Sequence, residues 1–256
     1  METNNQFNKV AQITILFWLM KIVATTLGET FGDFISMTLN FGYLVSLGIT
    51  ACVFLIALLV QLNCKKYIPY VYWLVIIATT TLGTEISDFI DRTLHLGYTG
   101  GSILLFVGLI STLLLWKQKH KDLKVYPISS RNKELYYWIA ILFSNSLGTA
   151  FGDYLSDVIG LSYLQGALVT ALIIVVVVLV HYFTKINEVV LFWLAFIFTR
   201  PFGATFGDFL TKPITKGGLD LGTLNASIVA LIVIVMLIYI EHTRHNKHIK
   251  NSSINV

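Results

Sequence analysis

The stretch WLMKIVATTLGETFGDF, residues 18–34, recurs three more times in this chain of 256 residues. The other copies begin at Trp73, Trp138 and Trp193, and all four align without a gap. In each copy a tryptophan precedes an aspartate by fifteen residues, a glycine lies five residues before that aspartate, and an aromatic residue follows it. Repetition at a fixed register indicates a fold built from copies of one structural unit.

The composition predicts an all-α integral membrane protein. Hydrophobic residues make up 55% of the chain and charged residues only 12%, whereas soluble domains carry about 25% charge. A second apolar run follows each motif, near residues 42–62, 97–116, 161–183 and 221–241. Runs of about 20 apolar residues are long enough to cross a bilayer. Each unit therefore contributes two helices, and eight transmembrane helices are expected.

We expect a single membrane domain over residues 1–256. A unit of two spans returns the chain to its starting side, so the four repeats are parallel. The predicted segments are repeats at about 10–62, 66–117, 131–183 and 186–242, a cytoplasmic loop at 118–130 and a basic tail at 243–256.

Loop charges predict the orientation in the cell (cytoplasmic) membrane. The termini and the loops on their side hold 13 Lys and Arg, whereas the opposite loops hold Arg92, Lys212 and Lys216. By the positive-inside rule both termini are cytoplasmic, and the motif tryptophans are expected in a belt at the inner interface. The net charge of +4 lies in short loops, so no nucleic-acid partner is expected.

The motif glycines have two interpretations. They are Gly28, Gly32, Gly83, Gly148, Gly152, Gly203 and Gly207, and Ser87 replaces the later glycine of the second copy. Small residues four apart let membrane helices approach closely. Alternatively, the glycines mark places where each helix unwinds and lines a cavity.

The motif acids are the candidate ion-binding residues. They are Glu29, Asp33, Glu85, Asp88, Asp153 and Asp208. A central Asp costs roughly 2.5–3.5 kcal/mol in a membrane helix, so a function is expected of them. Parallel repeats would bring the four aspartates towards one axis as metal ligands, with Arg200 as a counter-ion. The alternative is that each aspartate caps a segment or lies at the outer interface.

Neighbouring residues refine this hypothesis. Arg92 and Lys212 follow their aspartates by four residues, so ion pairs with some of the acids are expected. Hydroxyl groups that could add oxygen ligands are those of Thr25, Thr26, Thr80, Thr81 and Ser146.

With its W-x14-D spacing and G-x-x-x-G-D core, the chain resembles a family of bacterial membrane proteins with four tandem repeats of unknown function. The resemblance covers about residues 10–242 and implies two spans and one characteristic tryptophan in each repeat. The departures are Ile86-Ser87 in place of Phe-Gly and the longer turn TKPITKGGLDLGT of the fourth unit. The family supplies an architecture and no activity.

No enzyme constellation is present in the motifs, so neither an enzyme nor a cofactor is expected. Intramembrane aspartyl proteases use G-x-G-D, but no glycine lies three residues before any motif aspartate. The leading hypothesis is a transporter of a small cation, a divalent metal such as manganese, with proton-coupled export. The alternatives are a cation channel with a ring of aspartates and a non-transporting scaffold. The expected partners are membrane lipid, the cation and protons, and a homodimer is left open.

Overall fold

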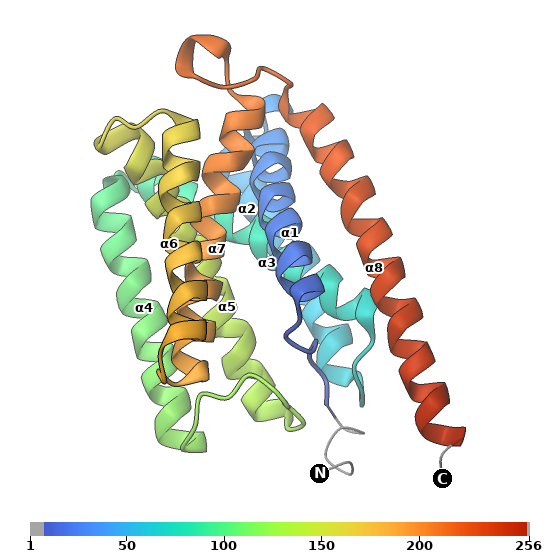
Figure 1. Cartoon of the computed structure of the whole chain (residues 1–256). Helices are drawn as coiled ribbons and strands as arrows, with labels where there is room; N and C mark the ends of the chain where they lie inside the picture. Colours follow the sequence, from blue (N-terminus) through green and yellow to red (C-terminus); the bar gives the residue numbers. More distant parts are fainter. Residues whose placement is uncertain (1–7, 255–256) are drawn as a thin grey trace.

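The computed structural model describes residues 8–254, and every regular element in that range is a helix. The long helices are α1 (Ile15–Asp33), α2 (Gly42–Asn63), α3 (Pro69–Asp88), α4 (Gly97–His120), α5 (Arg131–Asp153), α6 (Tyr163–Phe183), α7 (Glu188–Thr211) and α8 (Thr223–Ile254). Figure 1 shows that they form one bundle, with both described ends of the chain at the same end. The predicted all-α architecture is confirmed.

The first helices of the four repeats form a closed inner ring. Contacts join α1 to α3, α3 to α5, α5 to α7 and α7 back to α1. At each contact a motif glycine meets the residue eight positions before the next motif aspartate: Gly28 meets Thr80, Gly83 meets Asn145, Gly148 meets Arg200, and Gly203 meets Thr25. A Cβ atom on Gly83 would stand only 2.9 Å from that of Asn145, so these contacts require glycine.

The second helices of the repeats form an outer layer, and they do not pack mainly against the first helix of their own repeat. Each packs against the first helix of the following repeat: α2 on α3, α4 on α5, α6 on α7, and α8 on α1. Figure 1 shows α8 beside α1, where the last repeat closes on the first. The repeats are therefore interlocked rather than four separate hairpins.

Seven of the eight long helices are long and apolar enough to cross a membrane. The remaining one is α5, which carries Ser144, Asn145 and Ser146 on its buried face. Because both described ends lie at the same end of the bundle, α5 also traverses the bundle (Figure 1). Its membrane crossing stays a prediction.

The inner helices continue unbroken through their glycines, so the unwinding interpretation is wrong. A change of helix type occurs only after the motif aspartate, in the π-helical turns η1 (Phe34–Thr38), η2 (Phe89–Thr93) and η3 (Tyr154–Val158). In the fourth repeat α7 itself continues to Thr211, and a 3₁₀ turn follows, η4 (Ile214–Lys216).

Three of the four motif tryptophans are packed inside the ring and not in the predicted belt, whereas Trp18 is half-buried. Trp73 and Trp138 are fully buried, and Trp193 is 5% exposed. They lie in an aromatic layer that consists of Phe17, Tyr72, Trp73, Tyr137, Trp138, Phe192 and Trp193. The hydroxyl groups of Tyr72 and Tyr137 form a hydrogen bond of 2.5 Å in its midst. This layer fills the ring at the end opposite to the aspartates.

The predicted basic tail is helical for most of its length, because α8 runs on to Ile254. Residues 255–256 of the predicted tail lie outside the described residues.

Candidate cation-binding cavity

A polar cavity of about 280 Å³ lies where the inner helices reach their motif aspartates. Its lining comprises Glu29, Asp33, Met37, Arg92, Tyr98, Asp153, Ser156, Asp157, Tyr163, Asp208, Lys212 and Lys216. The exposed side chains of Met37 and Lys216 belong to this lining, so the cavity reaches the molecular surface. Five carboxylates and three basic groups contribute to this lining, so the cavity is bordered by charges of both signs.

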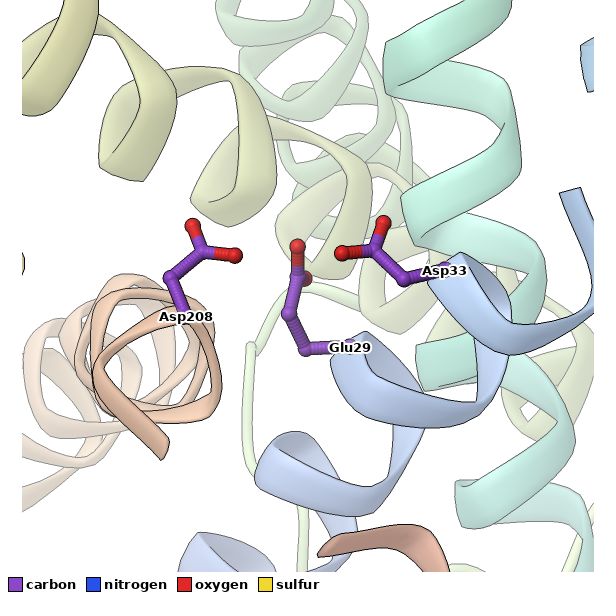
Figure 2. Close-up of side chains that lie close together, drawn as sticks. All are labelled: Glu29, Asp33 and Asp208. Carbon is purple, nitrogen blue, oxygen red and sulfur yellow. The ribbon is translucent and has the colours of Figure 1, made fainter. Parts of the chain in front are cut away.

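Three buried carboxylates converge within the cavity. One oxygen atom from each of Glu29, Asp33 and Asp208 lies within 4.8 Å of the other two. Figure 2 shows Glu29 and Asp33 one turn apart on α1, with Asp208 approaching from α7. Carboxylate oxygens are the ligands that hard divalent cations prefer. We call these residues the three-carboxylate cluster.

The ammonium group of Lys212 lies against this cluster. Its Nζ atom is 2.6 Å from Asp33 Oδ2 and 3.3 Å from Asp208 Oδ1. Burial lowers the pKa of Lys212, but the carboxylates of Asp208 and Asp33 raise the pKa by more, so the net shift is upward. A protein cation therefore neutralises part of the cluster, and its side chain is 22% exposed to solvent.

The other two motif aspartates form an equivalent arrangement around Arg92. Its guanidinium lies 3.3 Å from Asp88 and 3.1 Å from Asp153, and donates to Tyr43 Oη at 2.7 Å. The predicted ion pairs are thus present, and each cation also joins the aspartate of the following repeat.

The four predicted metal ligands therefore do not form one set. They are divided into two pairs, because only the second and fourth repeats carry a cation four residues after the aspartate. Met37 and Asp157 occupy that position in the other two repeats. Asp33 and Asp208 belong to the three-carboxylate cluster, whereas Asp153 only lines the cavity and Asp88 does not.

Glu29 is the innermost acid of the cavity and has a buried counter-ion. Arg200, which is fully buried, places its Nη2 atom 3.0 Å from Glu29 Oε2. The hydroxyl groups of Thr84 and Thr149 donate to the same oxygen at 3.3 and 3.5 Å. None of the five hydroxyl groups predicted from sequence makes this contact. Thr84 and Thr149 align with Glu29, four residues before the motif aspartate. The alignment of the repeats could therefore have identified these two hydroxyl groups as neighbours of Glu29.

Glu85 lies outside the cavity lining. It is fully buried, and neither of its oxygen atoms has a hydrogen-bond partner among the described residues. A Cβ atom on Gly32 would stand 3.4 Å from its Oε1 atom, so the carboxyl group lies against α1. The two glutamates of the first pair of repeats thus occupy different environments.

A second buried basic side chain lies deeper in the ring. Lys21 donates to Asn145 Oδ1 at 2.9 Å, and its ammonium lies 3.9 Å from the centre of the Phe196 ring. Counted back from the motif aspartates, Lys21 is twelve residues away and Arg200 eight. At a rise of 1.5 Å per residue the lysine is about 6 Å deeper than the arginine. Two buried basic side chains therefore lie between the cavity and the aromatic layer, and only that of Arg200 has a carboxylate partner.

Comparison with known families gives one match. The family described as "Repeat of Unknown Function (DUF347)" matches four tandem segments, residues 16–67, 71–122, 136–187 and 191–245. No curated protein and no solved structure matches the chain. The predicted resemblance to a family of four tandem repeats is confirmed.

Proposed function

Because this chain belongs to the family Repeat of Unknown Function (DUF347), whose description names no activity, we propose its function from the cavity. We propose that the protein is a membrane carrier for a small cation that binds between Glu29, Asp33 and Asp208. The observation that carries the proposal is the approach of three buried carboxylate oxygens within 4.8 Å of one another.

The charges of the cluster favour a divalent ion such as manganese. Arg200 balances one of the three carboxylates and Lys212 a second. If Lys212 moves into the solvent that it already contacts, two negative charges remain, and one divalent ion neutralises them. Oxygen-only ligands suit Mn²⁺, Mg²⁺ and Ca²⁺. Lys212 thus acts as a built-in competitor of the cation.

The loop charges favour an orientation with both termini inside, and the cavity would then face the outer side of the cytoplasmic membrane. This conformer would be the one that releases an exported cation to the outside. Protons that enter through the same cavity would then neutralise the vacated carboxylates, as proton-coupled export requires.

A cation channel is the weaker alternative. Ions that cross along the axis of the ring would meet the buried guanidinium group of Arg200, and beyond it the packed aromatic layer. Positive groups in a pore exclude cations. A non-transporting scaffold would explain the glycine contacts but gives no role to the three-carboxylate cluster.

Flux measurements on purified protein in liposomes test the proposal. We expect the wild type to move Mn²⁺ across the bilayer, and Asp33→Asn and Asp208→Asn to abolish the flux. The matched control is Asp122→Asn, because Asp122 is a loop acid that pairs with Lys133 away from the cavity. If flux in both cavity variants equals that of Asp122→Asn, the carboxylates carry no ion and the proposal is wrong.

A further inference from the structure

Residues 8–11, which we call the N-terminal strap, are inserted into the bundle before α1 begins. All four are at most 6% exposed. Val10 and Ala11 belong to the same buried core as Tyr72 and Trp73 of the aromatic layer. Because α1 begins beside the aromatic layer and ends at Asp33, a strap that precedes α1 lies at the end of the ring that is opposite to the cavity (Figure 1).

Hydrogen bonds attach the strap to three segments. Lys9 N donates to Ile128 O at 2.9 Å, and Ile128 N donates to Asn8 Oδ1 at 2.9 Å. Tyr67 N, before α3, donates to Asn8 O at 2.7 Å. Gln61 Nε2, in α2, donates to Lys9 O at 2.9 Å. With these bonds the strap is an ordered part of the fold.

A further contact of the strap joins the two halves of the molecule. Lys9 forms a buried ion pair with Glu134, at the start of the third repeat. Gln61, from the first repeat, donates to the other oxygen of Glu134 at 2.8 Å. Breaking a buried pair from one side leaves an uncompensated buried charge and is strongly destabilising. The strap thus fastens repeats one and two to repeats three and four at the aromatic end only.

We infer that the N-terminal strap is the inner gate of the carrier. This inference rests on the proposed carrier function, because alternating access requires the end opposite to the cavity to open. Parallel repeats in transporters exchange access by moving one half against the other. Such a movement separates Lys9 from Glu134 and Asn8 from Ile128, so the strap must leave its place in every cycle.

A reversible cross-link tests the gate. Asn8→Cys and Ile128→Cys are combined in a background with Cys52→Ser and Cys64→Ser, and Asn8→Cys alone, oxidised in the same way, is the control. We expect the cross-linked protein to bind Mn²⁺ within about twofold of the control. Its Mn²⁺ flux should fall at least about tenfold and return on reduction. Undiminished flux in the cross-linked protein would overturn the gate while leaving the carrier intact.

A second measurement does not depend on flux, so it tests the gate even if the protein carries no cation. Ile128 is fully buried in this conformer, so Ile128→Cys, made in the background with Cys52→Ser and Cys64→Ser, should react slowly with a maleimide. Adding Lys9→Met and Glu134→Gln together removes the pair without leaving a buried charge. We expect labelling to accelerate at least about tenfold, and equal labelling rates would overturn the gate.

Discussion

At the carboxylate end of the inner ring the four repeats differ, whereas at the aromatic end they are nearly alike. The residue before each motif tryptophan is Phe17, Tyr72, Tyr137 or Phe192, and these side chains fill the ring together. By contrast, the position four residues after each motif aspartate holds Met37, Arg92, Asp157 or Lys212. The shared features build the ring, and the differences build the site.

The glycine contacts hold the inner helices together and so support both ends of the ring. Their loss therefore has the largest expected effect on stability. A Cβ atom on Gly203 would overlap the side chain of Thr25 and stand 2.9 Å from its backbone carbon. We expect Gly203→Leu to yield no folded monomer in size-exclusion chromatography. Gly48→Leu is the control, because nothing lies within 4 Å of its Cβ position on the outer face of α2. Equal yields of folded protein from the two variants would show that the ring does not close through this contact between α7 and α1.

Arg200→Met tests the carboxylate end of the ring without changing the aromatic end. The change leaves Glu29 buried without its cation, and a broken buried pair costs about 3–5 kcal/mol. Thermal unfolding in detergent should show a large loss of stability. The double variant Arg200→Met/Glu29→Gln should recover most of it, because no unpaired charge remains. If Arg200→Met were as stable as the wild type, the ion pair between Arg200 and Glu29 would not be formed in solution.

Tyr72→Phe tests the aromatic end with the smallest expected effect. It leaves the buried hydroxyl group of Tyr137 without its partner, which costs about 1–3 kcal/mol. The thermal unfolding temperature should therefore fall less than in Arg200→Met, and Mn²⁺ binding should not change. If Mn²⁺ binding weakened markedly, the two ends would not be independent in this conformer.

The sequence could predict the ring because the repeats share one register. Alignment of the copies placed the glycines and aspartates at equivalent heights, and the G-x-x-x-G spacing predicted the close contacts. The partner choice of the outer helices was not predictable, since all four apolar runs look alike. The burial of Trp73 and Trp138 was missed for a similar reason, because tryptophan suits an interface belt as well as a packed core.

The site was predictable in its residues but not in its pairing. Asp33, Asp208, Glu29 and Arg200 were all identified from sequence, and they do come together. The division into two pairs depends on which aspartate each cation reaches in the next repeat. That choice follows from the order of helices around the ring, which one sequence does not contain.

Equilibrium binding of Mn²⁺ to the purified protein, measured by titration calorimetry, tests the central claim most directly. We expect saturable binding that Asp33→Asn weakens at least about tenfold, equivalent to about 1.4 kcal/mol. Lys212→Met should tighten binding, because it removes the competing ammonium and introduces the residue that the first repeat carries at Met37. Asp122→Asn should bind as the wild type does. Binding that is unchanged in Asp33→Asn, or lost in Lys212→Met, would contradict a cation site in this cavity.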